Sequence, residues 1–260
     1  MALADRVRAR ILSLVVILTV WWILSLGASE IGFPGPAQVG TAFIDLVASG
    51  RLFSALALTL SSFVVGAALA FAIGVPLGIL MGVRPWLGLA LDPYLTALYV
   101  MPFAAIIPLL VLWFGIDEFV RIVFISLFTL PQVTIVCYHG AKSTPTTQIE
   151  VAQTFLASRW QEFWNVVIPH EIPFIFTALR LGIGLAIQGL VVAELLIASV
   201  SGLGHLIRLS SASLDLASVL AVVLFVMLIG VGAVALMQRI EDSVAPWRHG
   251  TTIDSGGTNG

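Results

Sequence analysis

The sequence predicts an all-α membrane protein with six transmembrane helices. Of its 260 residues, 59% are hydrophobic and only 10% are charged, and the mean hydropathy is +1.08. Soluble domains carry about a quarter charged residues, so this composition indicates a chain that lies in a lipid bilayer. A helix needs about 20 apolar residues to cross the hydrocarbon core. Six segments meet that need: Ile11–Ala28, Ser54–Val83, Leu87–Gly115, Phe119–His139, Pro173–Val200 and Leu216–Ile240.

Basic residues predict the orientation of these helices. Arg6, Arg8 and Arg10 precede the first segment, and with this end inside the cell most other basic residues also fall on the cytoplasmic side. Positive charge collects in cytoplasmic loops, so we expect both termini in the cytoplasm. Residues 1–10 are then a cytoplasmic tail, residues 11–248 one transmembrane domain, and residues 249–260 a polar, disordered tail.

Three external stretches connect the helices. Phe33-Pro34-Gly35-Pro36 predicts a stiff turn because each proline fixes its own backbone and restricts the residue before it. Ala37–Leu52 has the pattern of an amphipathic helix. Ser201–His205, with two glycines, predicts a short turn.

The long polar interruption Thr147–Pro169 separates the fourth and fifth segments. It predicts two short helices, because Thr147 with Glu150 and Ser158 with Gln161 both match the capping-box pattern. The predicted orientation places this hairpin in the cytoplasm. We interpret it as a docking element for a partner protein.

Prolines divide the third segment. Pro102 and Pro108 should break its helix, and breaks at membrane depth are tolerated where the backbone is buried or lines a cavity. Tyr99, Met101 and Phe103 flank the first break, so they are candidates for a gate, although ordinary helix packing explains them equally well.

Catalytic and metal-binding patterns are weak in this sequence. The single lysine, Lys142, follows Ala141, so the phosphate-binding motif that ends in Gly-Lys-Ser/Thr does not occur. His170-Glu171 begins like a zinc-binding helix, but Phe174 stands where the second histidine should be. Ser199 in Ser-Val-Ser-Gly only faintly matches an intramembrane serine protease. One cysteine excludes an internal disulfide, and a net charge of −2 offers no basic face to nucleic acid.

The polar interruption resembles the "EAA" coupling loop of ATP-binding-cassette (ABC) importer permeases, which inserts into a groove of the ATPase subunit. Its strings Glu150-Val151-Ala152, Ser158-Arg159-Trp160 and Ile168-Pro169 carry the resemblance. Strings from residue 33 to residue 248 are similar to nitrate/sulfonate/taurine-type permeases, among them Gly74-Val75-Pro76-Leu77-Gly78 and Val192-Ala193-Glu194-Leu195-Leu196. The resemblance implies the type I (MetI-like) importer permease fold in the inner membrane of a prokaryote.

The resemblance also implies partners and site residues. A pair of ABC ATPase subunits would bind ATP and Mg²⁺, so this chain would be a non-catalytic permease without a cofactor or metal of its own. An extracytoplasmic substrate-binding protein would deliver a small organic or inorganic anion to a permease homodimer in the lipid bilayer. The implied ATPase-coupling residues are Glu150, Val151, Ala152, Leu156, Ser158, Arg159, Ile168 and Pro169. The candidate contacts of the binding protein are Ser201, Gly202, Gly204 and His205.

Leu156 departs from the family pattern, which has glycine where the chain turns between the two coupling helices. Leucine in a left-handed turn costs about 1 kcal/mol or more. Either the turn is rebuilt around Ala157 and Ser158, or Leu156 packs into the ATPase groove. Three of the coupling residues also have a purely structural explanation. Glu150 and Ser158 could simply cap helices, and Pro169 could simply begin a helix.

Glu194 lies within the fifth segment, where a carboxylate is costly and therefore a candidate for the substrate path. A buried structural contact explains it equally well. Gln188 is a weaker candidate on the same helix. The alternative function for the chain is an ATP-independent secondary transporter or channel, which would need intramembrane coupling charges or repeats and would leave the coupling loop without a purpose.

Overall fold

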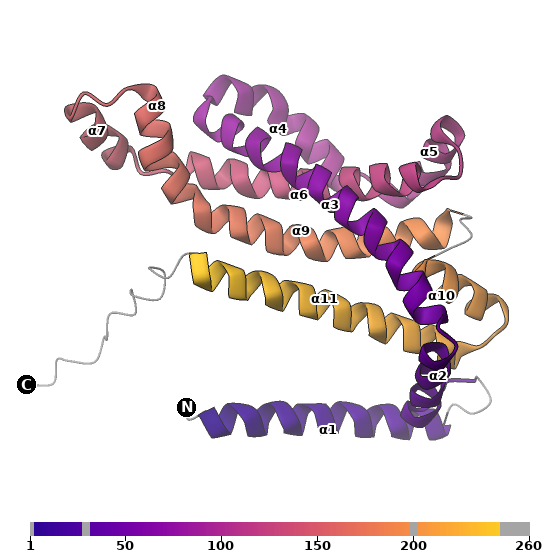
Figure 1. Cartoon of the computed structure of the whole chain (residues 1–260). Coiled ribbons are helices and arrows are strands. Elements are labelled where there is room, and N and C mark those ends of the chain that lie inside the picture. Colours follow the sequence, from indigo (N-terminus) through magenta and orange to yellow (C-terminus); the bar gives the residue numbers. More distant parts are fainter. Residues whose placement is uncertain (1–2, 28–31, 198–201, 245–260) are drawn as a thin grey trace, which may run out of the picture. The chain divides into compact units, whose positions relative to one another are not determined.

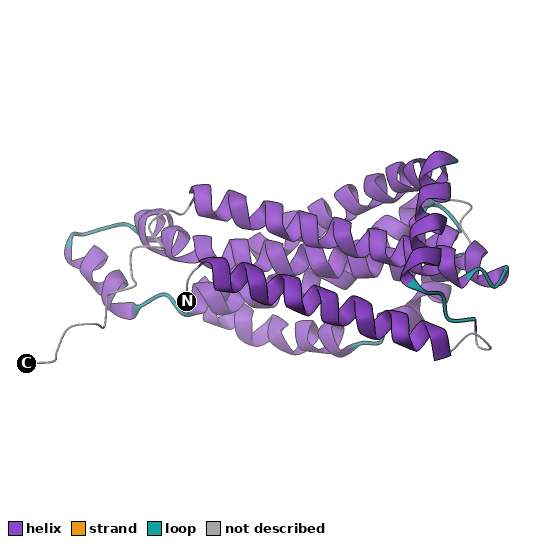
Figure 2. Ribbon diagram, turned by 90° about the horizontal axis from the view of Figure 1, so that it is seen from below, coloured by secondary structure: helices purple, strands orange, loops and turns teal. Residues whose placement is uncertain are grey.

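The computed structural model describes residues 3–27, 32–197 and 202–244, and within these ranges all regular structure is helical (Figures 1 and 2). Short loops join the helices. The elements are α1 (Leu3–Gly27), α2 (Pro36–Ala48), α3 (Arg51–Val83), α4 (Pro85–Val100), the 3₁₀ turn η2 (Phe103–Ile106), α5 (Ile107–Phe114), α6 (Glu118–Lys142), α7 (Thr146–Thr154), α8 (Arg159–Glu162), the π-helical turn η3 (Phe163–Val167), α9 (Ile168–Leu196), α10 (Leu203–Ala212) and α11 (Leu216–Val244).

The structure reproduces the predicted apolar segments, but not six uninterrupted spans. Within the described residues, four stretches are long and apolar enough to cross a membrane: α3, α6, the continuous helix from Arg159 to Leu196, and α11. The predicted third segment is α4 followed by η2 and α5, bent by 87°, which makes a fifth span only if the bent pair counts as one. The first segment appears within α1 as the shorter apolar helix Ile11–Gly27, and its last predicted residue, Ala28, lies outside the described residues.

The chain divides into two compact units. One contains residues 1–60 and 198–228, and the other contains residues 61–197 and 229–260, so α3 and α11 contribute to both. The expected single domain, residues 11–248, is thus built from two clusters of contacts. The expected disordered tail, residues 249–260, lies outside the described residues.

In the second unit, α6 and α9 form the most extensive helix pair and lie side by side in Figure 1. Helix α6 is the more deeply buried, with a fully covered side running from Val120 to Ala141. An apolar cluster between these helices contains Val133, Cys137 and Ala178. Helix α6 therefore forms the centre of this unit.

Four glycines let α3 approach α6 closely. Gly66, Gly74, Gly78 and Gly82 are spaced by multiples of four residues, so they lie on one helix face. A methyl group at Gly78 would overlap the carbonyl oxygen of Thr134 and lie 2.9 Å from the Tyr138 nitrogen. Small residues permit such approach between membrane helices, where dispersion contacts replace the hydrophobic effect as the source of association.

The break in the third segment lies where proline predicted it. Helix α4 ends at Val100, and the chain passes through Met101, which is extended, and Pro102 before η2 begins. Pro108 occupies the start of α5, where its missing N–H leaves no helical hydrogen bond unmade.

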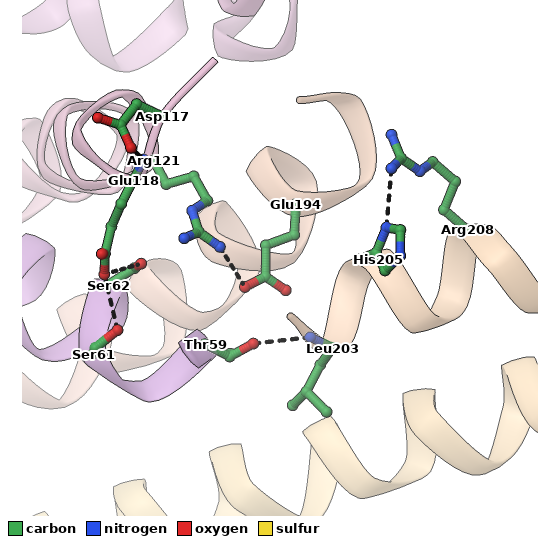
Figure 3. Close-up of polar contacts among 10 residues, drawn as sticks. All are labelled: Thr59, Ser61, Ser62, Asp117, Glu118, Arg121, Glu194, Leu203, His205 and Arg208. Carbon is green, nitrogen blue, oxygen red and sulfur yellow. Dashed lines mark hydrogen bonds and ion pairs between the residues drawn. The ribbon is translucent and has the colours of Figure 1, made fainter. Parts of the chain in front are cut away.

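The first unit contains α1, α2, α10 and the adjoining parts of α3 and α11. Val39 and Leu46 of α2 are buried, as its amphipathic pattern requires, while the Trp21 indole N–H donates to the Pro34 carbonyl (3.1 Å). The Leu203 N–H donates to Thr59 Oγ1 (2.8 Å), which fixes the start of α10 (Figure 3). The sequence predicts a short turn over Ser201–His205, but residues 203–205 instead form the start of α10.

Asp215 caps α11 by accepting a hydrogen bond from the Ser218 N–H (3.0 Å). Hydrogen bonds from the Ser218 side chain and backbone hold the pKa of Asp215 below its usual range. The carboxylate therefore stays charged at the positive end of the α11 dipole.

We expect Gly78→Ala to destabilise the protein by about 1–3 kcal/mol, because the added methyl must displace α6 backbone. Thermal unfolding of the detergent-solubilised chain measures the effect. The matched control is Gly184→Ala in α9, where a methyl group meets nothing within 4 Å and improves helix propensity. Equal unfolding temperatures for the two variants would contradict close α3–α6 packing.

Candidate functional site

The predicted coupling loop forms two short helices that stand out at one end of α6 and α9 (Figures 1 and 2). Helix α7 begins at Thr146, one residue earlier than the predicted cap. Pro145 occupies the N-cap position and makes no side-chain cap. The Thr147–Glu150 capping box was therefore wrong: Thr147 already lies inside the helix, where its side chain cannot cap it.

The second capping box is confirmed. Ser158 Oγ accepts from the Gln161 N–H (3.3 Å), and the Ser158 N–H donates to Gln161 Oε1 (2.8 Å). From this cap the chain runs through α8 and the π-helical turn η3 into α9 without a loop. The second helix of the predicted coupling loop thus continues into a membrane helix, and Ile168 and Pro169 lie at the junction.

Leu156 adopts the left-handed conformation that would favour glycine, with φ of 57°. Its N–H donates to the Gln153 carbonyl (2.9 Å), and the Ala157 N–H donates to the Ala152 carbonyl (3.1 Å). This is the Schellman arrangement that ends many helices. The turn is therefore kept at Leu156 itself, and the leucine side chain is 92% exposed.

Most of the predicted coupling residues lie at the surface. Glu150, Val151, Ser158, Arg159 and Pro169 are exposed, while Ala152 and Ile168 are half-buried. Apolar side chains are also exposed here, and we name them the coupling patch: Val151, Phe155, Leu156 and Trp160. A group of exposed apolar side chains is typical of a surface that contacts another protein or a membrane.

Glu194 forms an ion pair with Arg121 of α6 (Figure 3). The Arg121 Nη1 and Glu194 Oε1 atoms are 3.6 Å apart, and both side chains are almost completely buried. The apolar cluster of Phe124, Ala193 and Ile197 flanks the pair. Glu194 therefore has a structural partner within its own chain, Arg121, which the sequence alone did not identify as a candidate.

Glu118 makes a second polar link at the same end of α6. Its Oε1 accepts from the Ser61 and Ser62 hydroxyls (2.9 and 3.1 Å), and the Asp117 side chain caps the helix at the Glu118 N–H (Figure 3). This link ties α3 to the start of α6. The sequence feature that could have identified these polar contacts is the spacing of Glu118 and Arg121, which lie about one helical turn apart at the start of α6.

The gate candidates separate into two groups. Phe103 is buried beside Phe124 and Phe128 (ring centroids 6.4 and 5.5 Å apart), and Met101 packs on the same cluster. Tyr99 is 57% exposed and Gln188 is exposed. The structure thus brings Met101 and Phe103 into the cluster that also flanks the ion pair, but it does not bring Tyr99 or Gln188 there.

The candidate contacts for a binding protein lie at the start of α10. Gly202 and Gly204 are buried and His205 is half-buried, with its Nδ1 3.0 Å from Arg208 Nη2. Ser201 lies outside the described residues. Among the residues that the structure does describe, no three acidic, cysteine or histidine side chains gather closely enough to hold a metal ion.

We expect Arg121→Leu and Glu194→Leu each to destabilise the chain by about 3–5 kcal/mol, because each leaves a buried charge unpaired. The double variant should lose less than either single variant, which a double-mutant cycle of thermal unfolding would measure. Arg180 and Glu241, 3.6 Å apart with Arg180 one-third exposed, provide a comparison pair with a smaller coupling. Additive losses at Arg121 and Glu194 would show that the pair contributes nothing.

Comparison with known proteins identifies the family. The family described as "Binding-protein-dependent transport system inner membrane component" matches residues 74–246. The taurine transport system permease protein of Escherichia coli K12 is 33% identical, over 95% of this chain and 92% of its own length. A putative aliphatic sulfonates transport permease protein of Bacillus subtilis is 32% identical (90% and 85%), and a formylaminopyrimidine transport permease protein of Halalkalibacterium halodurans is 32% identical (83% and 85%).

The fold of this chain is similar to that of a solved transporter structure. An inward-facing structure of the MetNI methionine ABC transporter matches with a TM-score of 0.59 at 19% identity, over 76% of this chain and 96% of that chain. The expected MetI-like fold is therefore confirmed. The chain belongs to the inner-membrane permease components of binding-protein-dependent ABC importers, which are not themselves enzymes.

Proposed function

We propose that this permease transmits the closure of a separate ATPase pair to its substrate path through the segment 147–169. The observation that carries the proposal is the exposed α7–α8 hairpin, whose second helix continues without a loop into α9. A force on α8 acts directly on a membrane helix. Such rigid-body movement is a common way to switch between two states.

The assembly contains two copies of this chain, with both termini in the cytoplasm. The positive-inside distribution of basic residues supports the orientation. Closed two-fold symmetry is the commonest form of oligomer, which supports a homodimer. ATP and Mg²⁺ bind to the ATPase partner.

The substrate is a small anion of the sulfonate class. Relatives named for taurine and aliphatic sulfonates support this class. The relative named for formylaminopyrimidine shows that a similar permease serves a different solute. Transport of radiolabelled taurine and of an alkanesulfonate, with the binding protein present, tests the assignment.

Leu156 enters a groove of the ATPase. Its left-handed backbone costs about 1 kcal/mol relative to glycine, and its side chain makes no compensating burial within this chain. Contact with the partner would offset that cost. This accounts for a leucine at a position where glycine would be more stable in the isolated subunit.

The double variant Glu150→Ala/Ala152→Asp should reduce co-purification of the ATPase, and the ATP turnover stimulated by the binding protein, by at least about tenfold. The variant removes an exposed carboxylate from α7 and places another on its half-buried side. The matched control is Asp45→Ala/Ala48→Asp on α2, where both positions are exposed and the net charge is also unchanged. Full assembly of the first variant would refute coupling through α7.

Leu156→Gly should stabilise the isolated chain by up to about 1 kcal/mol and weaken ATPase binding by about fivefold to tenfold. Leu214→Gly is the matched control, because Leu214 also has a left-handed backbone (φ of 59°), is 84% exposed and ends a helix, α10. Thermal unfolding and titration with the purified ATPase measure the two effects. If both variants bind the ATPase as tightly as the wild type, Leu156 makes no contact.

A further inference from the structure

Glu171 is the most unusual buried group in the described structure. It lies in the first turn of α9, two residues after Pro169, and its side chain is completely buried. Within the described residues neither carboxyl oxygen has a hydrogen-bond partner. Buried polar groups are nearly always paired, so this exception calls for a physical explanation.

The surroundings of Glu171 are apolar and closely packed. The absent side chain of Gly140 in α6 makes room for the carboxyl group, since a methyl group on Gly140 would lie 2.6 Å from Oε2 and 2.5 Å from the Phe174 ring. We name this contact the α6–α9 joint: Cys137, Gly140 and Ala141 against Val167, Glu171 and Phe174.

The two hydroxyl groups that follow Gly140 and Ala141 along the chain are already engaged in hydrogen bonds. The Ser143 hydroxyl donates to the Gly140 carbonyl (2.7 Å), and the Thr144 hydroxyl donates to the Ala141 carbonyl (2.9 Å). A carboxylate without a donor in such a setting is so costly that the group takes up a proton instead. The closed joint therefore holds Glu171 as the neutral acid.

The joint lies where the coupling segment becomes a membrane helix. The π-helical turn η3 ends at Val167, which itself belongs to the joint. Such turns are frequent at functional sites, because they allow a helix to change its register. Movement of α8 would therefore act first on the contact between Glu171 and Gly140.

We propose that Glu171 is a positioning residue of the coupling mechanism, which keeps its proton while the α6–α9 joint is closed and releases it to water when the joint opens. Its functional consequence rests on the proposed coupling role of α7 and α8. The only bond that breaks is the O–H bond of the Glu171 carboxyl group, and its proton goes to water. The closed state binds one proton more than the open state, so raising the pH favours opening.

The other titratable groups on the elements around the joint are at least partly exposed, in contact with a polar partner, or part of the joint itself. On α6, Cys137 faces the joint, His139 is exposed, and the Lys142 ammonium donates to the Tyr138 hydroxyl (3.2 Å). On α9, the His170 ring nitrogen lies 3.2 Å from Ser143 Oγ. The η3 turn contains no titratable side chain, and α3 contains none between residues 52 and 83. On α7 and α8, Glu150 and Arg159 are exposed and Glu162 is half-buried.

Cys137 provides a reporter of joint opening, because it is the chain's single cysteine and is buried in the joint. We would measure its alkylation by N-ethylmaleimide between pH 5.5 and 8.5, in the complex with the ATPase and binding protein, by mass spectrometry of its peptide. The variants are Glu171→Gln, Glu171→Leu, and the control Asp92→Asn, which removes an exposed carboxylate from α4. The ratio of wild-type to variant rates cancels the part of the thiol's pH dependence that does not come from Glu171.

The ratio for Glu171→Gln and for Glu171→Leu should rise with pH, by at most about tenfold per pH unit, since one proton is released. The pH profile of stimulated ATP turnover should shift in the same two variants. The ratio for Asp92→Asn should stay constant. A constant ratio for both Glu171 variants in an assembled, transporting complex would overturn the inference and leave the proposed function intact.

If the wild-type chain fails to bind the ATPase, the proposed function falls instead. The same labelling, made on the full chain reconstituted alone in lipid vesicles, then decides whether Glu171 controls the joint. A rising ratio there would support the proton-linked joint without its coupling role. A flat ratio would overturn the joint as well.

Discussion

The close contact of α6 with its neighbours is the interaction on which the described second unit depends. Inside a membrane there is little hydrophobic gain from bringing helices together, so dispersion contacts must supply much of the association energy. Glycine makes those contacts possible on both sides of α6. Gly78 of α3 admits the α6 backbone, and Gly189 of α9 admits the ring of Phe128, 2.9 Å from where a methyl group would lie. Each glycine also weakens its own helix, which shows that close packing outweighs helix propensity here.

The polar groups near the two ends of α6 differ in a way that suits different roles. Near its start, Arg121 meets Glu194 in a buried ion pair, and removing either charge would leave the other without compensation. Near its end, Glu171 is buried without a hydrogen bond among the described residues. The first arrangement holds two helices in one position. The second arrangement, with Glu171 buried, lasts only while the α6–α9 joint stays packed. Such a contact is suited to opening and closing.

The length of the apolar segments predicted most of the fold, because a chain that crosses the membrane must form helices that satisfy their own backbone hydrogen bonds. The break at Pro102 and the Ser158 cap followed from local chemistry and needed no tertiary information. Helix α10 was missed, since its ten residues are amphipathic and too short to stand out beside the membrane segments. The Arg121–Glu194 pair was missed for a different reason: sequence identifies a buried carboxylate as costly, but its partner depends on how α6 and α9 pack.

Leu156 and Leu214 each have a strained backbone that the folded subunit alone does not explain. Both have left-handed backbones at the end of a helix, where glycine would be favoured, and both expose nearly the whole side chain. Neither the backbone nor burial within the chain explains a leucine at these positions. Such a residue is stabilised only when something else covers it. At Leu156 the exposed neighbours Phe155 and Trp160 enlarge the apolar surface, so a protein partner would gain more there than from leucine alone. The backbone strain at Leu156 in the free subunit therefore supports a contact with a partner protein in the assembled transporter.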